Sequence, residues 1–161
     1  MLHHDEMTKI IKRNSNMVYR LAFSQMKNRD DANDVYQDVF LRFIKRQPQF
    51  ENEQHEKAWF IRVTLNCSKT SLTSFWKTKV CEIDESFEAQ EVEKEDLTFA
   101  LNKLSKKYRA VIHLFYYEDM SIKDIAQSLN ISEGNAGMML SRARKKLKEI
   151  LERKSEYEKR I

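Results

Sequence analysis

Apolar residues recur at helical spacing along most of the chain. The first predicted helix covers residues 5–28, with apolar positions at Met7, Ile10, Ile11, Met17, Val18, Leu21 and Ala22. Either Asp30 or Asp31 is expected to cap a second helix, because a short acidic side chain accepts from the free amides of a first turn. That helix follows the i, i+3, i+4, i+7 spacing of one buried face and should end at Pro48.

A third predicted helix begins near Glu56 and continues toward Trp76. It is apolar on most sides as far as Asn66, so much of it should be buried. The periodicity is then lost over residues 78–96, which are interpreted as a linker with a short strand or turn at its start. Two further helical patterns follow over residues 97–116.

Helix start and stop signals lie close together in the C-terminal half. Ser121 and Asp124 resemble a capping box, with Asp in place of the usual Glu, before a short helix over residues 122–129. Asn130 can adopt the left-handed conformation that ends such a helix, and Ser132 can cap the next one. The next helix has an apolar stripe of Ala136, Leu140, Ala143, Leu147 and Ile150. Two helices joined by so short a turn predict a helix-turn-helix.

Composition narrows the fold class. The chain has one proline and two glycines, too few turn breakers for many short strands. Hydrophobic residues make up 41% and charged residues 34% of the sequence, which is typical of a folded helical protein and not of a disordered one. We predict an all-α protein with two small helical domains, residues 1–77 and 97–161, joined by an acidic linker at residues 78–96.

The net charge of +4 is unevenly distributed. Residues 82–96 contain eight acids and one base, whereas residues 141–161 contain nine Lys or Arg and four Glu. A basic face of this kind can meet a polyanion, although such runs are as often solvated helix surface. The sequence has no apolar run of about 18 residues and no signal-peptide pattern, so we expect a cytoplasmic protein without membrane insertion.

No catalytic, metal or cofactor site is expected. Cys67 and Cys81 do not form a C-x-x-C motif, and the four histidines are scattered. The sequence shows no pairing of nucleophile and base and no phosphate-binding loop. The chain is therefore predicted to be a binding protein and not an enzyme.

Three segments resemble the characteristic segments of extracytoplasmic-function sigma factors, the smallest bacterial sigma factors. They are DDANDVYQDVFLRF, AWFIRVTLN and SIKDIAQSLNISEGNAGMMLSRARKKL. The resemblance spans residues 17–151, whereas helix-turn-helix regulators share only the last segment. It implies a transcription initiation factor with two helical domains. The implied partners are core RNA polymerase, promoter DNA and, in some members, an anti-sigma factor.

The resemblance assigns surfaces to the first domain. The polar face of its second helix would dock on core polymerase through Asn33, Asp34, Gln37, Asp38, Leu41 and Arg42. The loop at residues 50–57 and the helix after it would capture a flipped base and melt the downstream promoter element. The residues assigned to that element are Asn52, Gln54, His55, Trp59, Phe60, Arg62, Asn66 and Lys69. Trp59 would equally suit the core, because it begins a largely apolar helix.

Two departures from the family pattern affect DNA contacts. Thr70 and Thr73 stand where the family has an acid and an arginine. In the helix implied to bind the upstream element, Asn135, Gly137, Met138 and Met139 replace the usual Thr, Lys, Ser and Arg. The residues assigned to the upstream element are Ser132, Asn135, Gly137, Met138, Met139, Ser141, Arg142, Arg144, Lys145 and Lys146. The methionines could pack on thymine methyl groups, or base recognition could be weakened.

Two alternative functions remain open at this stage. The chain could be a helix-turn-helix regulator that acts without polymerase, although its N-terminal half then has no explanation. It could instead be a sigma-like interaction protein whose DNA-binding face has degenerated, which the altered recognition helix favours. Co-purification with core polymerase separates the first alternative from a sigma factor, and transcription from promoter DNA separates the second.

Overall fold

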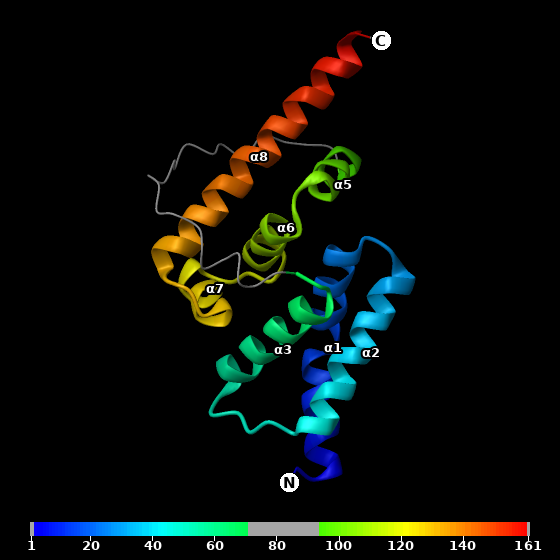
Figure 1. The fold of residues 1–161 in the computed structure, drawn as a ribbon, viewed down its shortest axis with the longest axis vertical. Helices are drawn as coiled ribbons and strands as arrows, with labels where there is room; N and C mark the ends of the chain where they lie inside the picture. The colour runs from blue at the N-terminus through cyan, green and yellow to red at the C-terminus, as the bar shows by residue number, and fades with distance from the viewer. Residues whose placement is uncertain (1, 71–93, 161) are drawn as a thin grey trace.

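The computed structural model describes residues 2–70 and 94–160. In the N-terminal domain, α1 (His4–Met26) and α2 (Arg29–Arg46) form an antiparallel hairpin, and α3 (Glu53–Cys67) packs against both (Figure 1). Every regular element within the described residues is helical, which confirms the predicted all-α fold.

The C-terminal domain contains α5 (Lys94–Lys103), α6 (Lys106–Ile112) and one π-helical turn, η1 (His113–Tyr117). These elements precede the helix-turn-helix formed by α7 (Ile122–Leu129) and α8 (Glu133–Arg160). The last turns of α8 extend away from the rest of the molecule, and the two termini lie at opposite ends (Figure 1).

The core of the N-terminal domain is built from the predicted apolar stripes. Val18 and Leu21 of α1, Phe43 of α2, and Phe60 and Leu65 of α3 are completely buried. The rings of Phe43 and Phe60 have centroids 5.4 Å apart. Aromatic contacts at such distances add to the stabilisation that burial provides, so this pair strengthens the packing of α3 on α2.

Several predicted boundaries differ from the structure. The N-cap of α2 is Asn28, whose side chain accepts from the Asp31 amide at 2.8 Å, so the assignment of this cap to Asp30 or Asp31 is wrong. Helix α3 begins at Glu53, one turn earlier than predicted, and α5 begins inside the predicted linker. The predicted extension of α3 to Trp76 and the strand or turn after it lie outside the described residues.

The local signals around the helix-turn-helix are confirmed. Ser121 accepts from the Asp124 amide at 3.0 Å, and the Asp124 carboxylate accepts from the Ser121 amide at 3.3 Å. Asn130 ends α7 in the left-handed region with φ 56°. Ser132 then accepts from the Asn135 amide at 3.0 Å. These bonds satisfy amides that a helix start leaves unpaired, so they define where α7 and α8 begin.

The two domains pack directly against each other, which the sequence did not predict. Helix α3 lies against α7, and α1 lies against α6 and η1. The buried apolar side chains of both domains form one continuous cluster. This contact positions the helix-turn-helix beside the helix assigned to promoter melting.

Candidate interaction surfaces

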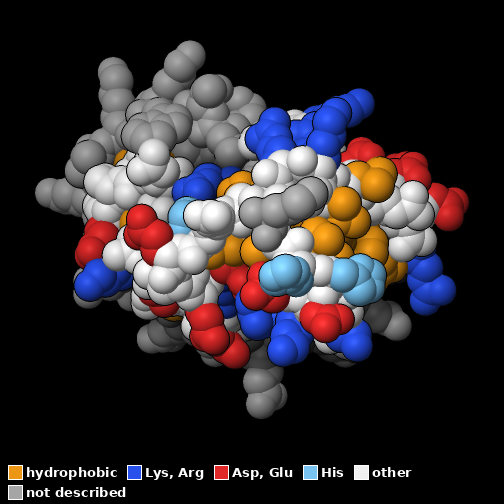
Figure 2. All heavy atoms as spheres, turned by 90° about the horizontal axis from the view of Figure 1, so that it is seen from below, with side chains coloured by type: hydrophobic (Ala, Val, Ile, Leu, Met, Phe, Trp, Pro, Cys, Tyr) orange, Lys and Arg blue, Asp and Glu red, His pale blue; other side chains and the backbone are white. Residues whose placement is uncertain are grey.

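The polar face of α2 is exposed as its spacing predicts. All six residues assigned to polymerase docking lie on the surface, and Leu41 exposes 62% of its area. Ile44, one turn further on, exposes 44%. Figure 2 views the end of the molecule where the N-terminus lies and shows charges of both signs around an apolar area. A large exposed apolar side chain among charges suits a contact surface, but the docking role stays a prediction.

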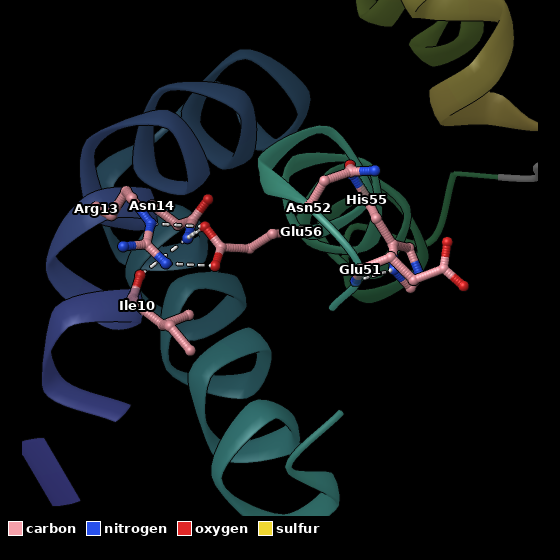
Figure 3. Close-up of polar contacts among 7 residues, drawn as sticks. All are labelled: Ile10, Arg13, Asn14, Glu51, Asn52, His55 and Glu56. Carbon is pink, nitrogen blue, oxygen red and sulfur yellow. Dashed lines mark hydrogen bonds and ion pairs between the residues drawn. The ribbon is translucent and has the colours of Figure 1, made fainter. Parts of the chain in front are cut away.

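Local hydrogen bonds shape the loop before α3. The Asn52 side chain accepts from the His55 amide at 2.8 Å and so caps α3. The His55 ring accepts from the Glu51 amide through Nδ1 at 3.1 Å. Figure 3 shows these residues grouped at the start of the helix. Asn52 and His55 therefore each use one polar atom to order the loop that is assigned to base capture.

Packing of the Phe50 ring on other aromatic side chains also holds this loop in place. Phe50 lies with its ring centroid 5.9 Å from Trp59 and 6.5 Å from Phe43. Trp59 is half-buried, whereas Phe60 is fully buried. Phe60 thus supports Trp59, and the exposure that a direct contact of Phe60 with the downstream element requires is not observed in this conformation.

A buried carboxylate joins α3 to α1. Glu56 accepts from Arg13 at 2.6 and 2.8 Å and from the Asn14 amide nitrogen at 3.0 Å (Figure 3). Asn14 also donates to the Ile10 carbonyl at 2.8 Å. Burial raises the pKa of Glu56, but the bonds from Arg13 and Asn14 outweigh it and lower the pKa below its ordinary value. The start of α3 is therefore held by an ionised pair.

The remaining residues assigned to the downstream element lie along α3 or just after its end. Asn66 and Lys69 are exposed, and Arg62 is half-buried. Arg62 Nη1 lies 3.4 Å from the Ser128 carbonyl of α7. The Gln54 side chain donates to Asp124 at 3.3 Å and to Gln127, both on α7. This surface of α3 is thus partly covered by the helix-turn-helix.

Thr70 explains one departure from the family pattern. It is buried, and its hydroxyl donates to the side chain of Gln25, which is only 1% exposed. Gln25 also donates to the Lys106 carbonyl at 3.0 Å. An acid at position 70 would place a charge in this buried contact, so the threonine is suited to the packing of the two domains. Thr73 lies outside the described residues.

The start of the recognition helix is buried. Residues 135–140 are all buried in this conformation, and Met138 and Met139 are 1% and 0% exposed. Met139 belongs to the apolar cluster, because it extends the stripe of Ala136, Leu140 and Ala143 by the i+3 position. The exposure that a base-contacting role requires of Met139 is therefore not observed.

The basic segment that follows is more accessible. Lys145 and Lys146 are exposed, Ser132 is exposed, and Ser141, Arg142 and Arg144 are half-buried. Arg144 donates through Nε to the Tyr116 hydroxyl at 2.7 Å, and its guanidinium lies 5.0 Å from the centre of the Phe115 ring. Rings from η1 therefore orient this cation, a support that sequence analysis missed.

An ion pair between the domains was also missed. Arg20 of α1 donates to Glu118 at 2.6 and 2.9 Å, and His113 Nε2 lies 3.5 Å from the same carboxylate. Burial raises the pKa of Glu118, but His113 and Arg20 lower it, and the net result is a pKa of about 2. We attribute the pairing mainly to Arg20, because the His113 distance is long for a hydrogen bond.

The described residues offer neither a metal site nor a membrane span. No group of His, Cys, Asp or Glu side chains among residues 2–70 and 94–160 could hold a metal ion. No helix in this part of the chain is long and apolar enough to span a bilayer.

Family models match both halves of the chain. Residues 10–78 match the model for Sigma-70 region 2, and residues 94–147 match the model for Sigma-70 region 4. The matched segments correspond to the helical hairpin with α3 and to the helix-turn-helix domain.

Individual proteins give the same result. The chain is 31% identical over 133 residues to the RNA polymerase sigma factor SigV of Bacillus subtilis, covering 79% of this chain and 80% of SigV. It is 28% identical over 152 residues to the ECF RNA polymerase sigma factor SigM of the same organism, covering 86% and 90%. The fold resembles that of Bartonella quintana RpoE, solved with the anti-sigma factor NepR. The TM-score is 0.66 at 22% identity, over 90% of this chain and 96% of RpoE.

Proposed function

The chain belongs to the extracytoplasmic-function family of RNA polymerase sigma factors, and we propose that it directs core RNA polymerase to a restricted set of promoters. The supporting observation is that a region 2 domain and a region 4 domain occur together, in that order. A regulator that acts without polymerase would need only the second domain. The proposed role is that of a cytoplasmic specificity subunit and not of an enzyme.

Binding of core polymerase is assigned to the exposed face of α2. Asp34 and Asp38 lie one turn apart, and Leu41 is the large apolar side chain beside them. An interface with an apolar centre and a charged rim gains affinity from the centre and partner selection from the rim. Neither aspartate is needed for the apolar core, so both can serve a partner.

Promoter melting is assigned to the loop before α3 and to the exposed side of that helix. Taking a base out of the stack costs a few kcal/mol, which ring stacking and contacts to the base edge must recover. Trp59 is suited to stacking because Phe50 and Phe60 hold it from two sides. Arg62 and Lys69 supply positive charge for the phosphates.

Binding of the upstream promoter element is assigned to α8. Arg142, Arg144, Lys145 and Lys146 form a basic segment along the helix, and phosphate contacts of this kind fix register and orientation on DNA. The burial of residues 135–140 favours a second candidate, a sigma-like protein that binds polymerase without recognising a promoter. These two functions make different predictions for transcription.

Transcription in vitro with core polymerase on a library of genomic fragments tests the proposal. The parent chain should yield transcripts whose start sites share upstream sequences. The double variant Asp34→Lys/Asp38→Lys should lose core binding at unchanged helix content. The matched control is Asp5→Lys/Glu6→Lys, which makes the same charge change at exposed positions of α1. Core binding without transcripts would favour the second candidate, and DNA binding without core binding would favour a regulator.

A further inference from the structure

A cavity lies between the two domains, and none of the residues that line it is assigned to core polymerase or to promoter DNA. Its volume is about 410 Å³, and α1, α5, α6 and η1 contribute its walls. Aromatic side chains and cations line it, and none of the described Asp or Glu side chains does. Cavities of about 300–1,000 Å³ with a largely apolar lining and a few polar groups are typical of small-molecule sites.

Two pairs of stacked rings, one pair from each domain, line this cavity. On α1, the rings of Tyr19 and Phe23 have centroids 6.3 Å apart and planes inclined by 29°. On η1, the rings of His113 and Tyr117 have centroids 5.4 Å apart and planes inclined by 16°. Phe23 and Tyr117 nevertheless expose 41% and 53% of their area. Large rings that stay exposed beside a cavity can stack on a planar ligand.

Lys27 and Arg109 bring positive charge to the cavity, and neither has a carboxylate partner within the described part of the chain. Lys27 donates to the Asn102 carbonyl at 2.7 Å. Arg109 is 3% exposed, and it donates to the Leu104 carbonyl at 2.8 Å and to the Gln25 carbonyl at 3.1 Å. Carbonyl oxygens solvate these two cations but do not neutralise their charge.

This uncompensated charge favours an anion in the cavity. The Nε atom of Arg109 is buried without a hydrogen-bond partner among residues 2–70 and 94–160. Burial, together with the charges of Arg109 and Lys103, lowers the pKa of Lys27. Another cation of the lining, Arg20, is already paired with Glu118. An anion beside Lys27 would relieve the repulsion among these cations and would accept charge-assisted hydrogen bonds.

We propose that this cavity binds a small planar aromatic anion, either a mononucleotide or an aromatic carboxylate. The ring of the ligand packs on the exposed aromatic side chains, and its charged group binds Lys27 under the attraction of Arg109. A ligand in this position contacts helices of both domains. The site shares no residue with the surfaces assigned to polymerase and promoter DNA, so its occupancy is independent of those assignments.

Isothermal titration calorimetry of the full chain with two anionic probes tests the proposal. The probes are adenosine monophosphate and naphthoate, and their neutral counterparts are adenosine and naphthylmethanol. At least one anion should bind about tenfold more tightly than its neutral counterpart, because only the anion can accept from Lys27. The probe that binds more tightly identifies the ligand as a nucleotide or as an aromatic acid. If neither anion binds more tightly than its neutral counterpart, the proposal is overturned.

Lys27→Gly removes the charge without endangering the fold. Lys27 follows α1 with φ 70°, a conformation that glycine adopts without strain, so this variant should keep its helix content. It should weaken binding of the tighter anion by about tenfold. The matched control is Lys69→Gly, which removes the same charge at an exposed position with φ 60° outside the cavity lining. Equal affinities of the two variants would overturn the site.

The aromatic lining is tested by a second pair of variants. Tyr117→Ala should weaken binding of the same anion by about fivefold, because it removes a ring on which the ligand stacks. Tyr157→Ala removes an exposed tyrosine of α8 and should leave the affinity unchanged. In nuclear magnetic resonance spectra, the backbone amides of Phe23 and Asn102 should shift as the ligand is added. An equal loss of affinity in both variants, or shifts confined to α3 and α8, would show that the ligand binds elsewhere and would overturn the proposal.

Discussion

Two Arg–Glu pairs on α1 use the same chemistry for different tasks. Arg13 and Arg20 lie seven residues apart, two turns along one side of the helix. Their side chains are 48% and 51% exposed, and each donates twice to a glutamate that is 6% or 3% exposed. Glu56 belongs to the same domain, whereas Glu118 belongs to the other.

The difference between the pairs lies in what each one joins. Loss of Glu56 removes one of the two hydrogen-bond acceptors of the Asn14 side chain, which is 5% exposed in the domain core. Loss of the Arg20–Glu118 pair should leave the helices of both domains intact and weaken the contact between the domains. Stability of the fold and strength of the contact between the domains should therefore respond separately to mutation and pH.

The largest loss of stability is expected when a charged side chain replaces an apolar one in the core of the C-terminal domain. Met139→Arg should destabilise the C-terminal domain by at least about 4 kcal/mol, because the guanidinium would replace a fully buried side chain of the apolar cluster. Region-resolved hydrogen exchange should show loss of protection in α7 and α8 with α1–α3 unaffected. Met139→Leu should cost less than about 1.5 kcal/mol. Normal protection together with an altered promoter preference would instead show that residue 139 contacts bases.

Breaking the pair inside the N-terminal domain should come next. Glu56→Ala should lower the unfolding free energy by about 3 kcal/mol, near the low end for a broken buried pair because Arg13 is half exposed and can be rehydrated. Urea unfolding followed by Trp59 fluorescence measures it. Glu53→Ala, at an exposed position of the same helix, is the control and should change stability by less than about 0.5 kcal/mol. A similar loss in both variants would mean that helix propensity, and not the pair, carries the effect.

Local features could be predicted from the sequence because they depend on neighbouring residues. The capping box of Ser121 and Asp124 and the left-handed Asn130 follow from residue types within a few positions. The exposed face of α2 follows from helical spacing. Met139 also lay on the apolar stripe by spacing, but correspondence with the family's arginine obscured this.

Contacts between the domains could not be predicted because their partners are distant in sequence. Arg20 and Glu118 are 98 residues apart, and each looks like an ordinary solvated charge. Gln25 and Lys106, whose carbonyl accepts from the Gln25 side chain, are 81 residues apart. One local signal was available: Gln25 continues the stripe of Leu21 and Ala22, so a buried polar side chain was implied there, and it had to have a partner.

The contact between the domains should weaken in acid, because the Glu118 carboxylate becomes protonated. The pKa of Glu118 is about 2 in the folded chain, where it is paired, and near 4.5 when the carboxylate is solvated. Its contribution to the contact between the domains is therefore complete above pH 4.5 and is lost as the pH falls from 4.5 toward 2. That contribution is no more than about 3 kcal/mol. Fluorescence energy transfer between dyes on cysteines placed at the exposed positions Lys45 of α2 and Glu152 of α8, with both native cysteines replaced by serine, should fall across this window.

Glu118→Gln is the control for this titration. This variant should weaken the contact between the domains at neutral pH. It should also remove the fall in energy transfer that protonation of Glu118 causes in acid. The pKa of Glu56 is lowered too, so the N-terminal domain also loses stability in acid, and Trp59 fluorescence follows that loss separately. Identical acid profiles of energy transfer in the parent and in Glu118→Gln would contradict the assignment.

The smallest effect concerns a contact that serves one domain only. Asn28 caps α2 by accepting from the Asp31 backbone amide, and its side-chain nitrogen donates to the Asp31 carboxylate at 2.8 Å. Both polar atoms of the Asn28 side chain therefore bond to Asp31. Asn28→Ala should cost about 1 kcal/mol of unfolding free energy, as is usual for a lost N-cap. Asp30→Ala changes an exposed acid of the same turn and should cost roughly 0.3 kcal/mol through the helix dipole alone. Neither change should alter interdomain energy transfer, although Lys27 beside this cap takes part in the contact between domains. If Asp30→Ala is the more costly of the two in urea unfolding, Asp30 and not Asn28 governs the start of α2.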